Sequence, residues 1–446
     1  MSYNSKDIPI FKTFACDNNY YIYDTFSNYI FEVTSAQFAE LSLLKKIGIQ
    51  NFIQLNKEEK AYKDILCLFD KGLLKSNFIS CIKHSESDYV EYLLKRQIND
   101  LSFQVTRNCN FNCRYCLYNN THNFERQHEA ANMTWSVAQK SIEYLYSHSC
   151  DSKSIGISFY GGEPLMNFEL IKQIVDYCRK LFYSKRISFR MTTNASLFTD
   201  EIINYVINNE FNIAISFDGP ERIQNKHRRF GTNGNDTYGT VRKIIDRIQK
   251  INMDYFNNHI SFIAVAFDDE NREDVISYFE DIGIDTKKVL IEEAGLSGID
   301  YIPNIFKNNS EKTLNKNLLF DSIYSDKKTI PTTWHHNGPC IPGIKRLFVD
   351  ISGKLYPCEK IVEHDCLSIG NIYSGIDIQK VEQFMNIGRL TEEECRVCWA
   401  MRYCDICVAS CNDITKGCVS AKQKLLACRF VKEKTLSNFK KYVKNT

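Results

Sequence analysis

The sequence lacks three features that would place the chain in a membrane, outside the cell or on nucleic acid. No stretch of its 446 residues reaches the run of about 18 apolar residues that a membrane-spanning helix needs. Its first residues do not have the basic and then apolar layout of a secretory signal peptide. Its 56 basic and 54 acidic residues give a net charge of only +2, which attracts neither nucleic acid nor an anionic membrane. We therefore expect a cytoplasmic protein with no nucleic acid and no membrane among its partners.

Cysteine, in contrast, is abundant. The chain has 18 cysteines, and ten of them lie between Cys340 and Cys428. Because thiols in the cytosol stay reduced, these cysteines indicate metal ligands rather than disulfides. The hydrophobic share of 43% is ample for packed interiors, and the chain is longer than one core usually organises, so two or three domains are expected.

The most informative stretch is Cys109-Asn-Phe-Asn-Cys113-Arg-Tyr-Cys116, which follows an apolar run at residues 101–105. On a loop that leaves a strand, its three thiolates can converge on one inorganic centre. A 4Fe-4S cluster takes four ligands, so three cysteines would leave one iron open to another molecule. The alternatives are a zinc site or three unrelated buried cysteines. Zinc usually takes paired cysteine or cysteine and histidine sets, and the nearest histidine, His122, follows no such spacing.

This stretch resembles the signature of the radical S-adenosylmethionine (radical SAM) superfamily, CxxxCxxC with an aromatic residue before the last cysteine, here Tyr115. The resemblance implies that the three cysteines hold a 4Fe-4S cluster whose open iron chelates S-adenosylmethionine. One electron, from a donor such as flavodoxin or ferredoxin, would then release a 5'-deoxyadenosyl radical. Tyr115 could flank the adenine of the cofactor.

From residue 101, strands alternate with helices, which indicates βα units and a parallel sheet. Six strands are expected, near residues 101–105, 155–160, 188–192, 212–217, 260–266 and 288–291. They predict an α/β fold with a partial (β/α)6 barrel, an open relative of the eight-unit TIM barrel. Active residues should then lie where the strands end.

Gly161-Gly162-Glu163-Pro164 directly follows the second of these strands. Two glycines would let the backbone approach a ligand closely, and the carboxylate could accept hydrogen bonds from an ammonium group. Taken alone, the four residues could be a turn. They also resemble the superfamily's GGEP motif, which holds the amino group of S-adenosylmethionine.

Further polar residues follow the third and fourth strands. Asn194, Ser216 and Asp218 supply amide, hydroxyl and carboxylate groups that could hydrogen-bond the ribose and carboxylate of the cofactor. The string SFDGPERIQNKHRRF, which starts at Ser216, resembles a segment of the peptide-modifying branch of the superfamily. The resemblance implies that the serine and a later arginine reach the cofactor. By alignment that arginine is Arg228, with Arg229 as its competitor.

The start of the chain predicts a small winged-helix-like unit. Residues 20–24 and 29–33 have the pattern of a β-hairpin, and two helical patterns follow the expected caps Ser35 and Asn56. The apolar residues at 72–75 can close the sheet. This order resembles the recognition domains fused to maturases of ribosomally made peptides, which bind a precursor's leader as an extra strand on a sheet edge. An ordinary packing extension is the alternative.

The cysteine-rich end resembles the SPASM extension found in this superfamily. The matching positions are Cys340, Gly353, Cys358, Cys395, Cys398, Cys404 and Cys428. The pattern has a further cysteine four residues after Cys404, which would fall at Val408. Cys407 and Cys411 flank that position, and the spacing to Cys428 favours Cys411 as the ligand. The resemblance implies two auxiliary 4Fe-4S clusters: one on the hairpin cysteines and the flanking cysteine, and one on Cys395, Cys398, Cys404 and Cys428. Zinc is the alternative.

The hairpin supplies only Cys340 and Cys358, so the first auxiliary cluster could keep an open iron for a substrate thiolate. Cys366 and Cys418 are spare candidates for closing it. Glu359 occupies a place where some relatives carry an acidic proton acceptor, which makes it the candidate catalytic residue. Alternatively, it pairs with a neighbour such as Lys360.

These patterns predict three domains: a leader-recognition domain at 1–95, a radical SAM barrel at 96–330 and a SPASM domain at 331–446, with an asparagine-rich linker at 304–328. The chain looks like a radical SAM maturase that installs thioether crosslinks, from cysteine sulfur to carbon, in a ribosomally synthesised cysteine-rich precursor peptide. The enzymatic alternatives are a sulfatase-maturing enzyme that forms formylglycine and a carbon–carbon crosslinking enzyme. The non-enzymatic alternative is an iron-sulfur scaffold that binds peptides.

Overall fold

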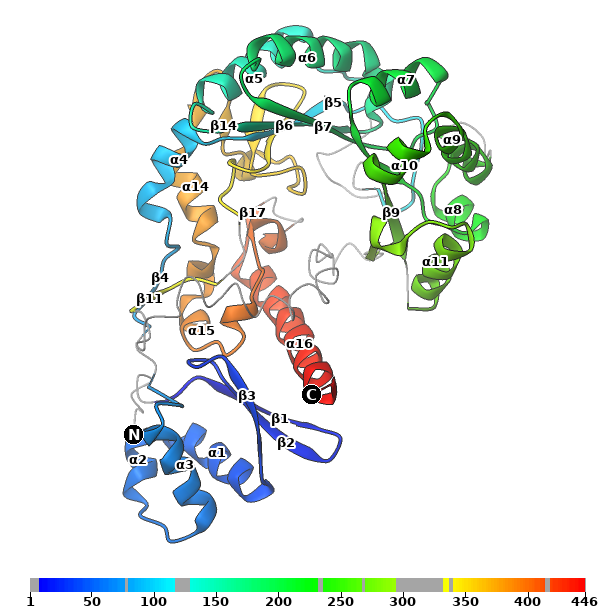
Figure 1. Ribbon diagram of the computed structural model, residues 1–446. Coiled ribbons are helices and arrows are strands. Elements are labelled where there is room, and N and C mark those ends of the chain that lie inside the picture. Colours follow the sequence, from blue (N-terminus) through cyan, green and yellow to red (C-terminus); the bar gives the residue numbers. More distant parts are fainter. Residues whose placement is uncertain are drawn as a thin grey trace.

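A computed structural model describes residues 8–76, 79–116, 129–231, 236–266, 269–293, 332–336, 340–413 and 418–445. Figure 1 shows the N-terminal unit at one end, an arch of alternating strands and helices at the other, and the cysteine-rich segment between them. The expected linker at 304–328 lies outside the described residues. None of the helices within these ranges is long and apolar enough to span a membrane.

The N-terminal unit is an antiparallel three-stranded meander followed by three helices. These elements are β1 (Phe11–Cys16), β2 (Asn19–Asp24), β3 (Tyr29–Val33), α1 (Ser35–Ile47), α2 (Ile49–Gln54) and α3 (Lys60–Asp70). Their apolar sides share one buried core, which includes Ile22, Leu41, Phe52 and Tyr62. The predicted hairpin and both predicted helices are present, and β1 and α2 add to them.

The predicted helix caps are wrong by one and by three residues. Thr34, not Ser35, caps α1, because its hydroxyl accepts from the backbone of Gln37 while the Gln37 side chain accepts from Thr34. Helix α3 starts after Glu59 rather than after Asn56.

The predicted closing strand at residues 72–75 is also wrong. Leu74 has a φ of +51°, which a strand does not tolerate. Among the described residues, Ser76 forms an isolated bridge to Pro9, which precedes β1. This stretch therefore adds one bridge rather than a closing strand.

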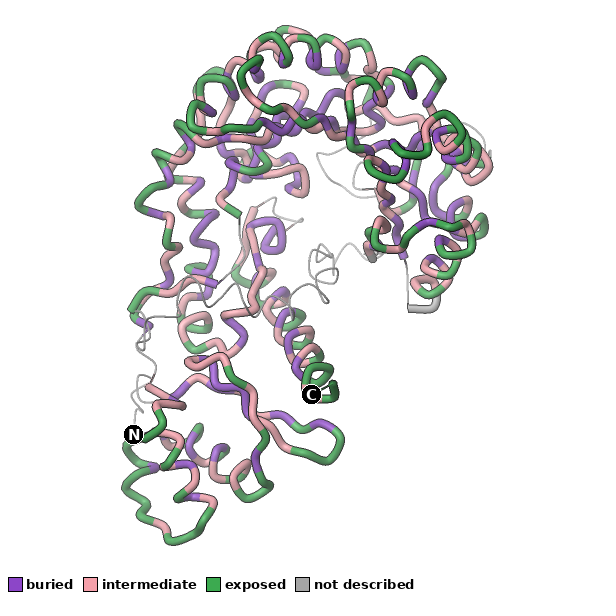
Figure 2. The backbone as a smooth tube through the Cα atoms, in the orientation of Figure 1, coloured by how far each residue is buried: buried purple, intermediate pink, exposed green. Residues whose placement is uncertain are grey.

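The predicted partial (β/α)6 barrel is confirmed. Its six parallel strands, in sheet order, are β10 (Val289–Glu293), β9 (Ile260–Ala266), β8 (Asn212–Ser216), β7 (Arg186–Thr193), β6 (Ser154–Gly161) and β5 (Asp100–Thr106). The helices are α5 (Trp135–Ser147), α6 (Phe168–Leu181), α7 (Asp200–Asn208), α8 (Glu221–His227), α9 (Thr237–Ile251), α10 (Met253–His259) and α11 (Asp269–Asp281). Figure 2 shows largely buried strands and helices with one exposed side, as expected for a sheet covered by helices.

The cysteine-rich segment continues the barrel sheet. Strand β12 (Leu347–Val349) pairs in parallel with β5, and β13 (Lys354–Tyr356), β14 (Gly370–Asn371) and β15 (Gly375–Ile376) follow as antiparallel neighbours. Two short pairs join β4 (Cys81–Ile82) to β11 (Thr333–Trp334) and β16 (Asn412–Asp413) to β17 (Cys418–Val419). The remaining α-helices of the described ranges are α4 (Val90–Arg96), α14 (Ile378–Met385), α15 (Glu392–Arg396) and α16 (Ala421–Asn445). Short 3-10 helices cover Ser87–Tyr89, Pro164–Asn167, Thr286–Lys288, Asp365–Leu367, Ile387–Thr391, Met401–Tyr403 and Val408–Cys411.

The N-terminal unit packs against the cysteine-rich segment. The centroid of the Phe439 ring on α16 lies 4.7 Å from the centroid of the Tyr23 ring and 6.0 Å from that of the Phe14 ring. Arg402 donates to the backbone carbonyls of Thr25 and Phe26 at 2.6 and 2.9 Å. Through these contacts the N-terminal sheet is fixed to the segment that carries most of the cysteines.

Candidate active site

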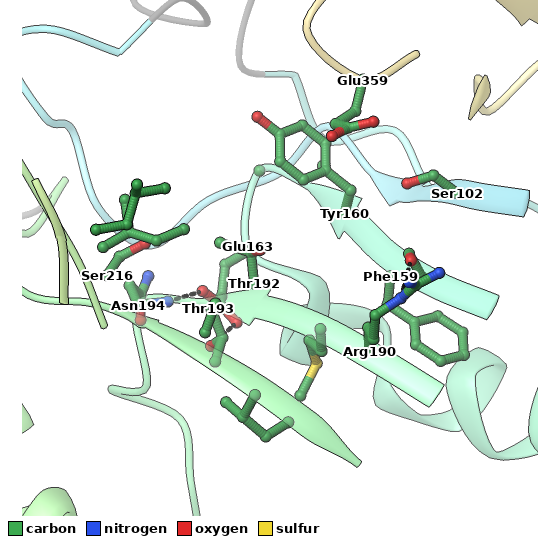
Figure 3. A pocket seen from close by; sticks show the side chains of 18 of the residues that line it. Ser102, Phe159, Tyr160, Glu163, Arg190, Thr192, Thr193, Asn194, Ser216 and Glu359 are labelled. Atoms are coloured by element: carbon green, nitrogen blue, oxygen red, sulfur yellow. Dashed lines mark hydrogen bonds between the residues drawn. The ribbon is translucent and has the colours of Figure 1, made fainter. Parts of the chain in front are cut away.

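A pocket of about 610 Å³ lies among the carboxyl ends of the barrel strands. Its lining includes all three cysteines of residues 109–116, here called the cysteine loop, and Gly161, Gly162, Glu163, Asn194, Ser216 and Arg228. Figure 3 shows that Glu163, Asn194 and Ser216 cluster in one part of the pocket, with Arg190 and Glu359 in others. The sequence thus predicted residues that share one cavity of the size that small-molecule ligands occupy.

The cysteine loop is fixed by the segment 227–231. The backbone N–H of Asn112 donates to the carbonyl of Arg229 at 2.7 Å. The rings of Phe111 and Phe230 pack edge to face with centroids 4.8 Å apart. The cysteine loop follows β5, and residues 227–231 follow α8 (Glu221–His227), the helix after β8, so neighbouring βα units hold the loop and its support together.

The thiols of this loop are buried. Burial raises the pKa of Cys109, and it raises the pKa of Cys113 to about 12 although the charge of Arg228 acts in the opposite direction. Metal coordination would supply the stabilisation of the thiolate that the buried site lacks. Within the described ranges, no three His, Cys, Asp or Glu side chains are arranged to hold a single metal ion. In a four-iron cluster each thiolate binds a different iron, so that arrangement is not required.

Gly161 and Gly162 make close contact with the protein's own backbone. Gly161 has a φ of +135°, and a Cβ there would lie 2.1 Å from the carbonyl oxygen of Thr106. A Cβ on Gly162 would lie 2.1 Å from the carbonyl oxygen of Asn108. These glycines are therefore needed where the end of β6 passes the start of the cysteine loop, a reason that the sequence did not reveal.

Glu163 is a buried carboxylate held by three donors. It accepts from the hydroxyl of Thr193 at 2.6 Å and from the backbone N–H groups of Asn194 and Leu165 at 2.7 and 3.1 Å. Burial raises its pKa to about 7, while these donors act to lower it. A positive group in the pocket would favour the ionised form, so Glu163 suits an ammonium ligand.

Asp218 does not line the pocket, although the sequence placed it among the cofactor-binding residues. Its carboxylate accepts from the Tyr115 hydroxyl at 2.8 Å, from the Arg228 guanidinium at 3.0 Å and from the backbone N–H of Val265 at 2.9 Å. Tyr115 and Arg228 do line the pocket, whereas the competitor Arg229 is exposed. Asp218 thus holds two pocket residues in place from behind.

A second part of the pocket is charged. Arg190 pairs with Asp100, and Arg346 pairs with Glu359 at 2.8 Å. The alternative expected for Glu359, a pair with a neighbouring charge, is present with Arg346 as the partner, and Lys360 lies 3.8 Å from Glu292. Arg190 lies within β7, where no motif marks it, so it could not be found from the sequence.

The sequence of residues 103–282 matches the family model of the radical SAM superfamily. These residues include the cysteine loop, the GGEP motif, and the ends of β6 to β9. Residues 103–282 belong to the radical SAM superfamily. The chain is thus an enzyme, and the cofactors of this class are a 4Fe-4S cluster and S-adenosylmethionine.

Three curated proteins are similar to the chain. It is 37% identical over 121 residues to an uncharacterized protein, MJ0907, of Methanocaldococcus jannaschii. The aligned residues are 27% of this chain and 39% of that protein. It is 25% identical to the radical SAM cyclopropyl synthase TigE of Paramaledivibacter caminithermalis, over 72% of this chain and 68% of TigE. It is 24% identical to a cysteine-type anaerobic sulfatase-maturating enzyme of Clostridium perfringens, over 73% of this chain and 92% of that enzyme.

Among solved structures, the fold is similar to that of anSMEcpe with bound AdoMet, with a TM-score of 0.55 and 19% identity. The match covers 78% of this chain and 95% of the other. At this identity the likeness establishes the fold alone.

The pocket of the radical SAM domain fits the two cofactors. Three thiols on one loop can ligate three irons and leave the fourth iron open. Beside them lie a carboxylate, Glu163, and a guanidinium, Arg228, which match the ammonium and carboxylate groups of an amino acid moiety. Ile263 and Val265 on β9 add apolar lining.

The cysteines beyond the radical SAM domain form two groups. Burial raises the pKa of Cys340 and Cys358, and negative charge at Cys407 raises both further, with Glu359 also acting on Cys358. Burial also raises the pKa of Cys398 and Cys404. Cys398 interacts with Cys395 and Cys428, and Cys404 interacts with Cys398 and Cys428. The charge interactions favour Cys407 as the third thiol beside the hairpin cysteines, whereas the spacing favours Cys411, which interacts with Cys407 and with Cys428.

Cys366 and Cys418 form a disulfide. The expectation that all cysteines of this chain stay reduced is wrong for this pair, and so is the suggestion that either thiol closes a cluster. The two residues lie 52 positions apart and follow no cluster spacing, so the sequence did not reveal their pairing.

Replacing Cys407 by serine is expected to lower the iron content by up to about four atoms per chain, because a first auxiliary cluster would lose a ligand. Cys411→Ser and Cys366→Ser are the matched controls and should retain full iron. Iron and sulfide analysis after anaerobic reconstitution measures the difference. Equal loss in the Cys407 and Cys411 variants would contradict the grouping.

Proposed function

We propose that the chain is a peptide maturase that uses radical chemistry to install thioether crosslinks in a ribosomally synthesised, cysteine-rich precursor peptide. The observation that carries this proposal is the N-terminal sheet, whose strand β3 pairs only with β2 among the described strands. An unpaired strand edge can accept a peptide as an additional strand. Tyr29 on β3 is 67% exposed and offers an aromatic contact beside that edge.

The reacting end of the peptide would enter the pocket of the radical SAM domain. Bound there, S-adenosylmethionine and the cluster supply a 5'-deoxyadenosyl radical after one electron arrives from a donor such as flavodoxin or ferredoxin. Glu163, Asn194, Ser216 and Arg228 would hold the cofactor, and Tyr115 would flank its adenine. The aliphatic lining from β9 would exclude water from the reacting atoms.

Forming the proposed crosslink would release one hydrogen atom, one proton and one electron from the substrate. The bound cofactor would supply the radical that takes a hydrogen atom from a substrate carbon, and a cysteine sulfur of the substrate would then bond to that carbon. The thiol proton would go to Glu359, which faces the pocket with Arg346 beside it. The remaining electron would go to an auxiliary cluster, either on Cys340, Cys358 and Cys407 or on Cys395, Cys398, Cys404 and Cys428.

Two other reactions are favoured by specific relatives. A sulfatase-maturating reaction is supported by the match over 92% of the Clostridium perfringens enzyme, and carbon–carbon bond formation by the name of the relative TigE. Mass spectrometry of a co-expressed precursor, combined with thiol labelling, separates the three reactions. A thioether removes two hydrogens and one labelled thiol per bond, formylglycine formation removes the cysteine sulfur, and carbon–carbon bonding leaves every thiol free. Only the first result supports the proposal.

Deleting residues 1–76 is expected to weaken leader binding at least tenfold, or about 1.4 kcal/mol, while peptide-independent cleavage of S-adenosylmethionine continues. The cut falls before Cys81–Ile82, because this strand pairs with β11 and Ile82 donates to Glu392 at 2.7 Å. Phe439→Gln in the truncated chain would keep the newly exposed face of α16 soluble. Fluorescence anisotropy of a labelled leader measures binding, and unchanged affinity would count against the role of this unit.

A further inference from the structure

Lys424 on α16 is a buried lysine without a carboxylate partner in the described ranges. Only 1% of its surface is exposed. Its ammonium nitrogen lies 2.5 Å from the hydroxyl oxygen of Thr391, 3.1 Å from the sulfur of Cys395 and 4.0 Å from the sulfur of Cys428. Burial of an unpaired charge is costly, so this ammonium needs anions nearby. The two sulfurs are the groups in reach that can become anions.

Lys424 lies on the buried side of its helix, where a charged residue is unusual. The buried side of α16 consists of Lys424, Ala427, Val431, Thr435 and Phe439. At this spacing an apolar residue is expected on the buried face of a helix. Lys424 instead directs a charge toward the group formed by Cys395, Cys398, Cys404 and Cys428. Thr391 fixes it there, since its hydroxyl also lies 3.6 Å from the Cys395 sulfur.

We propose that Lys424 is a positioning residue that raises the reduction potential of an auxiliary 4Fe-4S cluster on Cys395, Cys398, Cys404 and Cys428. The inference rests on the proposed function, because it requires this cluster. A cluster with four thiolate ligands is negatively charged, and one-electron reduction adds a further negative charge. A cation that donates to two of the ligands stabilises the reduced form more than the oxidised form.

The lysine keeps its proton throughout, so the redox change moves one electron and no proton through this residue. In the proposed reaction the electron left after crosslinking would enter this cluster more readily. The ammonium would thus help to make the cluster an electron acceptor rather than a donor.

The test is an anaerobic redox titration of the full-length, reconstituted protein, monitored by electron paramagnetic resonance. Cys109, Cys113 and Cys116 are replaced by alanine in every sample, so that only auxiliary clusters titrate. Lys424→Met removes the charge and keeps an unbranched side chain. At the midpoint potential of the parent protein, the ratio of reduced to oxidised cluster should fall at least tenfold, which is a shift of about 59 mV for one electron.

Lys432→Met is the matched control. Lys432 lies about two turns further along α16, is half-buried and makes no hydrogen bond to a sulfur in the described ranges. Its charge also lowers the pKa of Cys398 and Cys428 but without a hydrogen bond to either sulfur, so its removal should shift the potential less than the removal of Lys424. An equal shift in both variants would overturn the specific role of Lys424.

The remaining outcomes also decide the question. Full iron with an unchanged potential in Lys424→Met would overturn the inference and leave the proposed maturase intact. If Lys424→Met loses the cluster, Lys424→Arg separates charge from shape: restored iron supports the need for a cation, and continued loss overturns it. Parent protein without any auxiliary iron would contradict the proposed clusters themselves, and the role of Lys424 with them.

Discussion

Replacing Cys109, Cys113 and Cys116 together by alanine is expected to reduce S-adenosylmethionine cleavage to background. The reason is that all three thiols of one cluster are removed from the pocket that also contains Glu163 and Arg228. Iron should fall by about four atoms per chain, the content of one 4Fe-4S cluster, while auxiliary iron stays. Production of 5'-deoxyadenosine under strong reductant and total iron are the two measurements.

A matched control replaces Cys67 and Cys150 by alanine. Both are exposed free thiols outside the cysteine groups. This variant should cleave S-adenosylmethionine at the parent rate and keep all of its iron. Cleavage retained in the triple variant would refute the cluster on the cysteine loop, and cleavage lost in the control would show general damage instead.

Replacing Asp218 by asparagine is expected to lower the free energy of unfolding by about 3–5 kcal/mol, because a buried guanidinium loses its counter-charge. Asp218 is fully buried and Arg228 is 6% exposed. The same carboxylate also accepts from Tyr115 and Val265. Since Arg228 and Tyr115 line the pocket, the affinity for S-adenosylmethionine should fall as well. Urea denaturation and equilibrium binding measure the two effects.

The exposed ion pair between Asp200 and Arg247 is the matched control. Its two side chains are 55% and 53% exposed and water screens their charges, so Asp200→Asn should change the free energy of unfolding very little. The double variant Asp218→Asn with Arg228→Met should be less destabilised than the sum of its parts, because the unpaired charge is gone. Equal small costs at Asp218 and Asp200 would contradict the view that Asp218 fixes the pocket.

Much of the fold and the site could be predicted because the decisive signals are local. The spacing of Cys109, Cys113 and Cys116 and the strand before Gly161 are both visible along the chain. Parallel strands bring their carboxyl ends to one side of a sheet, which places these segments together. The six barrel strands followed from the same alternation.

The features that could not be predicted depend on contacts distant in sequence. Gly161 is needed because of the Thr106 carbonyl, and Cys407 groups with thiols at Cys340 and Cys358. Spacing alone favoured Cys411 as the ligand of that group, and its side chain is fully buried. Strand β12 joins β5 across more than half of the chain, and the disulfide links Cys366 to Cys418. No periodicity encodes pairings of this kind.

Single residues whose partners are distant in sequence also could not be predicted. Arg190 lies within β7 and is tied to Asp100 of β5, a pairing that only the sheet register reveals. Lys424 was hidden for another reason, since a lysine on a helix normally lies at the surface. Its burial beside two sulfurs becomes visible only when α16 and the cysteines are seen together.

The most direct test of the central claim is the electron paramagnetic resonance spectrum of the reduced, anaerobically reconstituted parent protein with and without S-adenosylmethionine. If three cysteines leave one iron open in the pocket, the cofactor should change the spectrum of one cluster and yield 5'-deoxyadenosine. Both effects should be absent from the triple cysteine variant. A protein that binds zinc in place of iron, or a spectrum that the cofactor leaves unchanged, would contradict this account.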